Sequence, residues 1–178
     1  MNNQTVSDIY AANERISEKL KAVISNLTDE QADFLPEGEK WTIANLVEHI
    51  AMVEEGITKI SAKLLEQAQA AGVESNGFAK LSENFTQKAL EAQAQKFEAP
   101  DRVRPTGKQT ITESLAKMEE NNKRLEEIRP LFESVECSDF KFPHPFMGEL
   151  SAHEWLALIG GHKARHLKQL ENLLEKAK

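Results

Sequence analysis

Apolar residues recur every three or four positions over four long stretches of the chain, which is the spacing of one buried helix face. The first stretch covers about residues 5–27, the second about 42–70, the third about 110–129, and the fourth starts at Ser151. We expect the third to end before Pro130, because proline inside a helix removes a backbone hydrogen bond. The pattern predicts an all-α fold, a four-helix bundle.

Helix start signals support these boundaries. Thr110 with Glu113, and Ser151 with Glu154, have the spacing of a capping box, in which each side chain accepts a hydrogen bond from the other residue's backbone N–H. Thr42 is typical of an N-cap residue in front of the second stretch. Three of the four helices therefore have a predicted first residue.

The segment 71–109 lacks a long apolar stripe. Glycines and prolines bracket a polar stretch that has room for one short helix around residues 80–97. We expect a long crossover between the second and third helices, as some four-helix bundles have. Connections of this length often cover a functional site.

Length and charge limit the class of protein. A chain of 178 residues fits one domain, so we expect residues 1–178 to form a single domain. A formal net charge of -7 provides no basic surface, which argues against nucleic acid or an anionic membrane as a partner. No apolar run approaches the roughly 18 residues of a membrane span, and the start does not resemble a signal peptide. We expect a cytoplasmic protein.

Two histidines of the fourth helix carry the clearest chemical signal. His162 and His166 are four residues apart and lie on the stripe that includes Trp155 and Ile159. Side chains at this spacing lie one above the other, and a metal ion would satisfy both imidazoles at once. In the alternative interpretation, the pair forms hydrogen bonds to other core groups or lines an interface.

The remaining histidines are less clearly placed. His49 lies at the edge of the buried stripe of the second helix, whereas Glu48 and Glu55 point away from that stripe and are expected to be solvated. His144 and His153 precede the core of the fourth helix, and we expect surface or capping positions for both.

Three amide side chains are candidates for contacts with a substrate. Asn13 and Asn122 fall on buried stripes, where an amide must be hydrogen-bonded, either within the core or to polar substrate atoms. Gln169 lies on the inward face of the fourth helix, where it could orient or polarise another group. The sequence contains no obvious general base beside these residues.

Several short motifs, taken in order along the chain, resemble the DinB-like superfamily, which includes YfiT-like metal-dependent hydrolases and bacillithiol transferases. The motifs are Trp41-Thr-Ile followed by Val47-Glu-His49-Ile, then Pro100-Asp-Arg-Val-Arg-Pro105, then His144-Pro-Phe-Met-Gly148, and Gly161-His162-Lys-Ala-Arg165-His166. Relatives more often have phenylalanine directly before that glycine, where this chain has Met147.

The resemblance implies a four-helix bundle with a metal site formed by His49, His162 and His166. It implies a divalent metal, with zinc, nickel and iron all suited to imidazole ligands. The activity that it favours is transfer of a low-molecular-weight thiol to a small electrophilic substrate. The alternatives are metal-dependent hydrolysis of an amide or ester, and a stress protein that binds a metal or ligand without turnover.

The resemblance also implies a homodimer, because similar bundles often pair. The turn before the fourth helix carries more apolar side chains than a loop needs, which is typical of a contact patch. The alternative is that these side chains close the end of the bundle. They are Phe140, Phe142, Phe146 and Met147.

Overall fold

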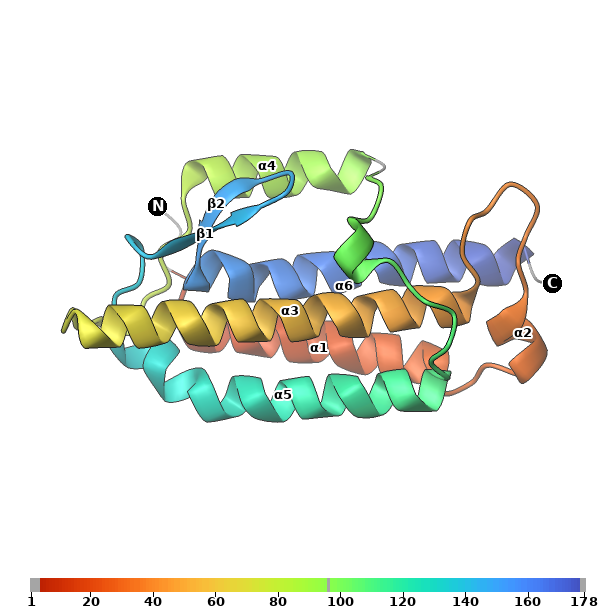
Figure 1. The fold of residues 1–178 in the computed structure, drawn as a ribbon, viewed down its shortest axis with the longest axis horizontal. Coiled ribbons are helices and arrows are strands. Elements are labelled where there is room, and N and C mark those ends of the chain that lie inside the picture. Colours follow the sequence, from red (N-terminus) through yellow and green to blue (C-terminus); the bar gives the residue numbers. More distant parts are fainter. Residues whose placement is uncertain (1–3, 96, 177–178) are drawn as a thin grey trace.

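The computed structural model describes residues 4–95 and 97–176. Over this part of the chain four long helices lie side by side, as Figure 1 shows, and they confirm the all-α four-helix bundle. They are α1 (Val6–Ile24), α3 (Ile43–Ala70), α5 (Ile111–Ser134) and α6 (Ala152–Lys176).

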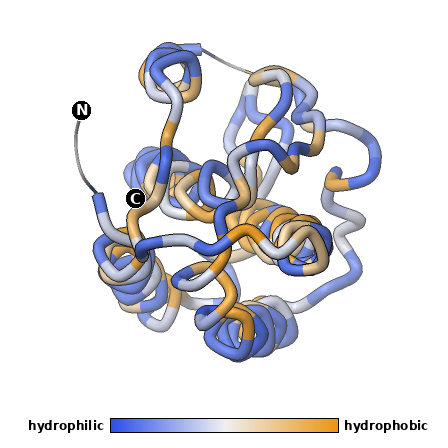
Figure 2. The backbone as a smooth tube through the Cα atoms, turned by 90° about the vertical axis from the view of Figure 1, so that its left-hand side faces the viewer, coloured by the Kyte–Doolittle hydropathy of each residue, from blue (hydrophilic) through white to orange (hydrophobic). Residues whose placement is uncertain are grey.

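Helix α3 has the most extensive packing in the bundle. It lies against both α5 and α6, and α1 packs mainly on α6, whereas α1 and α5 make few contacts with each other. Hydrophobic residues face the space between the helices when the bundle is viewed from its end (Figure 2). The order around the bundle is therefore α1, α6, α3, α5, and the two helices that carry the predicted histidines are neighbours.

Shorter elements cover one side of the bundle. After the small α2 (Asp29–Asp33), the crossover contains α4 (Glu83–Ala94) and the 3-10 turn η1 (Asp101–Val103). A hairpin of β1 (Lys141–His144) and β2 (Gly148–Ser151) precedes α6. Helix α4, the hairpin and η1 lie over α3 and α6 in Figure 1. The long crossover is confirmed, but the sequence pattern did not predict the hairpin.

The start signals read from the sequence are confirmed. Thr42 and Thr110 each accept a hydrogen bond from the backbone N–H three residues later, and Glu154 Oε2 accepts from the N–H of Ser151 at 2.9 Å. The expected end of α5 is wrong, because the helix continues through Pro130 to Ser134. Pro130 lies on the exposed side, where the carbonyl that loses its partner can bind water.

The predicted buried position of Asn122 is also wrong. Asn122 is exposed, and its neighbour Asn121 is 1% exposed, with Nδ2 donating to the backbone oxygen of Ala51 at 3.3 Å. The buried face of α5 includes Ser114 and Phe132, so it is rotated by roughly half of the 100° step between residues from the stripe that the apolar positions indicated.

The apolar turn before α6 is mostly packed inward. Met147 is buried, and Phe140 and Phe142 lie against the core, whereas Phe146 is 45% exposed. Most of these side chains therefore close the end of the bundle. In the described parts of the chain, no helix combines the length and the apolar character needed to cross a membrane.

Candidate metal centre

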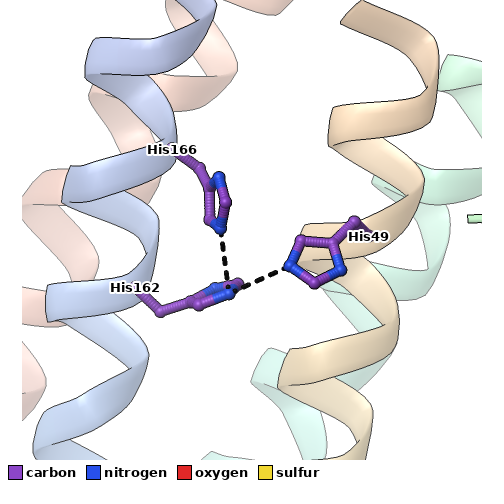
Figure 3. A group of neighbouring side chains, drawn as sticks. All are labelled: His49, His162 and His166. Atoms are coloured by element: carbon purple, nitrogen blue, oxygen red, sulfur yellow. Dashed lines mark hydrogen bonds between the residues drawn. The ribbon is translucent and has the colours of Figure 1, made fainter. Parts of the chain in front are cut away.

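Three histidines from two neighbouring helices converge on one point, as Figure 3 shows. Helix α3 carries His49, and α6 carries His162 and His166 one turn apart. Nε2 of His162 lies 3.2 Å from Nε2 of His49 and 3.1 Å from Nε2 of His166. The i,i+4 spacing on α6 and the packing of α6 on α3 together explain this arrangement.

Two of the three rings are oriented by oxygen atoms that lie on the side of the ring away from the cluster. Nδ1 of His49 lies 2.7 Å from the backbone oxygen of Val103 in η1, and Nδ1 of His166 lies 3.0 Å from Oε1 of Gln169. Because these oxygens accept hydrogen bonds, each Nδ1 carries the proton. Each Nε2 therefore directs a lone pair into the cluster, which is the tautomer that a metal ligand needs.

The three rings bring together more nitrogen lone pairs than N–H groups, so hydrogen bonds among the rings cannot pair every nitrogen. Nε2 of His162 faces two lone pairs, from His49 and His166, and a neutral imidazole has only one N–H to offer. A cation at this point would accept all three lone pairs. The ligand atoms lie within 4.8 Å of one another, so the residues fit a metal ion.

Burial keeps these imidazoles neutral. Loss of hydration lowers the pKa of His49 from its usual value, and it lowers the pKa of His166 to about 3. The pKa of His162 lies well below its usual value, first because of burial and then because of the other two rings. All three are therefore unprotonated near pH 7, as metal binding requires.

Glu48, which we expected to be solvated, is 1% exposed and fastens the crossover to α3. Its Oε1 accepts from the backbone N–H and the hydroxyl of Thr106 at 3.0 and 2.6 Å, and its Oε2 accepts from the N–H of Gly107 at 2.9 Å. The crossover lies over the outer side of α3, which the sequence stripe left exposed. Glu48 thus holds the segment whose Val103 carbonyl orients His49.

Glu55 also differs from the expectation of a simply solvated charge. Its side chain is 23% exposed, and it forms ion pairs with Lys59 at 2.7 Å and with Lys117 at 2.8 Å. Lys117 belongs to α5, which packs beside α3. Glu55 therefore links these two helices at the edge of their interface.

A buried ion pair, missed from the sequence, lies beside the histidines. Lys163 follows His162 in α6 and binds Glu54 of α3, and both side chains are 2% exposed. Nζ of Lys163 also donates to Oγ of Ser17 at 2.9 Å, which brings in α1. The available signal was that Glu54 and Lys163 each follow a buried isoleucine by four residues, so each charge lies on a buried face.

The three amide candidates are not brought together. Gln169 contacts His166, whereas Asn13 and Asn122 line a cavity of about 440 Å³ between α1, α5 and α6 whose lining includes none of the three histidines. Nδ2 of Asn13 donates to the backbone oxygen of Leu156 at 2.9 Å, which supports the core hydrogen bond rather than a substrate contact.

Two other histidines are more covered than expected, and the expected surface or capping position is wrong for His153. His153 is fully buried, with Nε2 3.1 Å from the backbone oxygen of Phe132 and Nδ1 3.5 Å from Sγ of Cys137. His144 is partly buried against Trp155, with ring centroids 5.2 Å apart. Both are covered because the hairpin folds back onto α6, a contact that local periodicity does not indicate.

Comparison with known proteins gives three matches. The family model for the DinB superfamily matches residues 12–170. The uncharacterized protein YuaE of Bacillus subtilis (strain 168) is 27% identical over 155 residues, which span 86% of this chain and 89% of YuaE. A crystal structure described as TT2238, a four-helix bundle protein, aligns with a TM-score of 0.62 and 21% identity over 94% of this chain and 99% of that chain. The last match concerns the fold.

Proposed function

The chain belongs to the DinB superfamily, and on that premise we propose that it is a metal-dependent transferase, which joins a low-molecular-weight thiol to an electrophilic carbon. The observation that carries this proposal is the convergence of the Nε2 atoms of three neutral imidazoles on one point. Imidazole ligands suit zinc, nickel and iron, so the cofactor is a divalent cation of this group.

The three histidines would leave at least one coordination position for a substrate atom, which is the property of a catalytic rather than a structural site. A cation bound there supplies a Lewis-acid position that favours the deprotonated form of a thiol near neutral pH. The protein holds His49 through Val103 and His166 through Gln169, so the ligands are oriented before the substrate arrives.

In the proposed reaction, the thiol proton leaves to solvent and the sulfur electron pair forms a new C–S bond. The leaving group departs from the same carbon with the electron pair of the bond that breaks. A haloaromatic electrophile would release halide, so charge and atoms balance without a further reactant.

The placement of carboxylates favours thiol transfer over hydrolysis. Hydrolysis of an amide needs a group that moves protons between water and the leaving nitrogen. The buried carboxylates are already engaged, with Glu48 on the crossover, Glu54 on Lys163 and Glu154 on Ser82 and Ser151. A thiol that is already deprotonated needs no such group.

The test is turnover by the purified protein reloaded with zinc, nickel or iron. Cysteine and other small thiols are supplied with chlorodinitrobenzene, and a parallel series contains nitrophenyl esters without thiol. We expect metal-dependent, thiol-dependent release of chloride that disappears in His162→Ala. Ester cleavage without thiol would support the hydrolase instead, and metal binding without turnover in either series would indicate a binding protein.

A further inference from the structure

The cavity that Asn13 and Asn122 line lies on the side of the bundle away from α4 and the hairpin (Figure 1). Helices α1 and α5 form its two walls and make few contacts with each other, and α6 forms its floor. Its volume of about 440 Å³ is within the range of small-molecule sites, which is roughly 300–1,000 Å³. None of the three clustered histidines lines it, so a ligand bound here would occupy a second site.

Side-chain contacts between α1 and α5 cross the cavity toward both ends. Nζ of Lys21 lies 2.7 Å from Oε1 of Glu119, and the hydroxyl of Tyr10 donates to the backbone oxygen of Leu125 at 2.7 Å. Tyr10 and Lys21 are separated by about 16 Å along the axis of α1, at 1.5 Å per residue. The space between these two contacts is therefore a groove that runs along the helices and suits an elongated ligand.

Apolar side chains form most of the inner surface of this groove. Leu156 and Ile159 of α6 lie between Leu20 of α1 and Met118 and Leu125 of α5, and all five are buried. An aliphatic chain lying along them would remove its own apolar surface from water, which favours binding.

Lys163 places one polar group in the floor of the groove. Its side chain is 2% exposed, and Nζ donates to Oγ of Ser17 at 2.9 Å and to a carboxylate oxygen of Glu54. An ammonium group has three N–H bonds, and the described residues provide no acceptor for the third. Lys163 and Ser17 both line the cavity, so an oxygen atom of a ligand would accept this N–H.

The charges of the lining that lack an ion pair are both negative. Lys21, Arg129 and Lys163 each have a carboxylate partner. Glu14 and Glu18 line the groove without a cationic partner among the described residues. These two exposed carboxylates are four residues apart on α1, so their like charges repel each other. A positively charged group beside them would offset this repulsion, whereas an anion would add to it.

We propose that the groove between α1 and α5 binds an aliphatic amino alcohol. The ammonium group lies beside Glu14 and Glu18, the hydroxyl oxygen accepts the third N–H of Lys163, and the carbon chain follows the apolar floor. Ser17 lies between the two glutamates in the sequence of α1 and contacts Lys163, so the amine and the hydroxyl belong on neighbouring carbon atoms. This site goes beyond the proposed function and does not depend on it.

The test measures binding of 2-amino-1-octanol to wild type through the amide chemical shifts of the labelled protein. We expect a Kd on the order of 0.1–1 mM, as a ligand of about ten non-hydrogen atoms would provide. The shifts should change most along the facing sides of α1 and α5. Because amines also bind metal ions, the titration is done with zinc added and after chelation. Equal affinity is expected, and binding only in the presence of zinc would overturn the inference.

Three further probes each change one part of the ligand. Octylamine lacks the oxygen atom and should bind about fivefold more weakly, because the Lys163 N–H stays without an acceptor. The probe 1-octanol lacks the ammonium group and should bind about threefold more weakly, since exposed charge pairs contribute little. Octanoate carries the opposite charge and should be the weakest of the four. Octanoate binding as tightly as 2-amino-1-octanol would overturn the inference.

A pair of double variants tests the ammonium position. In Glu14→Gln with Glu18→Gln, the preference for 2-amino-1-octanol over 1-octanol should disappear. The matched control is Glu127→Gln with Glu171→Gln, which changes the net charge equally at exposed positions outside the lining and should keep the threefold preference. Equal loss in both variants would show a general effect of net charge and would reject the ammonium position.

The hydroxyl position is tested at Lys163. Lys163→Met alone would leave Glu54 buried and unpaired, so the variant combines Lys163→Met with Glu54→Leu. It should bind 2-amino-1-octanol and octylamine equally, because the N–H that distinguishes them is gone. A fivefold difference that persists in this variant would overturn the inference, as would amide shifts along α1 and α5 that no probe changes.

Discussion

The backbone oxygen of Val103 lies 2.7 Å from Nδ1 of His49, although the two residues are 54 positions apart in the chain. This contact makes the crossover part of the histidine cluster rather than only its cover. Since the crossover is fastened by Glu48, the neighbour of His49, the orientation of one imidazole depends on a carboxylate that does not face the cluster.

Substitution Glu48→Gln should weaken metal binding without removing a ligand. The amide loses charge-assisted hydrogen bonds to Thr106 and Gly107, so the Val103 carbonyl is held less firmly. We expect about tenfold lower metal affinity, measured by competition with a chromogenic chelator. Glu55→Gln, on the same helix but engaged with Lys59 and Lys117, should keep wild-type affinity.

Single substitutions should separate the proposed ligands from other buried histidines. His49→Ala and His162→Ala should lose nearly all metal at equilibrium, measured by elemental analysis after reloading. His153→Ala should keep its metal but unfold more easily by about 1–3 kcal/mol, because its hydrogen bond to Phe132 lies in the core. Full metal content in His162→Ala would reject the site.

Chelation of wild type should leave its helical circular dichroism nearly unchanged, since the core forms without the ion.

Removal of one partner of the buried ion pair should be costly. Lys163→Met leaves Glu54 buried and unpaired, and we expect the free energy of unfolding to fall by about 3–5 kcal/mol in urea denaturation. The double variant Lys163→Met with Glu54→Leu should regain most of that loss, because no charge remains buried. A double variant as unstable as the single one would show that the loss comes from packing.

Two adjacent glycines of α6 should respond in opposite directions to alanine. A Cβ at Gly160 would collide with Oδ1 of Asn13, so Gly160→Ala must displace α1 or break the hydrogen bond from Asn13 to Leu156. We expect a loss of about 1–3 kcal/mol in thermal unfolding. A Cβ at Gly161 meets nothing within 4 Å, so Gly161→Ala should stabilise the helix by about 0.5–1 kcal/mol.

Acid should destabilise the fold partly through Glu136. Burial alone raises the pKa of this carboxyl, but Lys80 and Ser138 together lower it to about 2. Because the folded pKa lies below the unfolded value, the contribution is present above about pH 4.5 and is lost as the pH falls toward 2. We expect Glu136→Gln to flatten the pH dependence of stability in this window by about 2 kcal/mol, measured by urea denaturation. Glu119 is an exposed carboxylate whose pKa is also lowered, by its pair with Lys21, and Glu119→Gln should flatten the same window by less because solvent screens that pair.

Local sequence signals predicted most of the fold, because helix stripes and capping boxes depend on residues three or four positions apart. The same spacing identified His162 and His166. The third member, His49, came from the family resemblance, since no local rule relates it to residues more than 100 positions away. Ser151 and Glu154 predicted the start of α6. The hairpin directly before it was not predicted, because its sequence has no clear alternation of apolar and polar residues.

The unexpected burial of Glu48 and Lys163 has one physical cause. Stripes identify the most apolar side of a helix, but α3 is enclosed on several sides, by α5, α6 and the crossover. A residue such as Glu48 can therefore be polar, lie off the stripe and still be buried. The stripe of α6 likewise did not predict that Lys163 is buried, because this burial depends on a partner in another helix.

Helices α3 and α6 meet through two unlike contacts, which are adjacent in the sequence of α6 and five residues apart on α3. His162 faces His49, and the adjacent Lys163 binds Glu54, about one and a half helical turns farther along α3. A shift of α6 by one residue would move its side chains by about 1.5 Å along the axis and 100° around it, which would separate both contacts. The alignment of these two helices is therefore specified twice, once by neutral nitrogen atoms and once by opposite charges, and loss of the metal would leave the second contact in place.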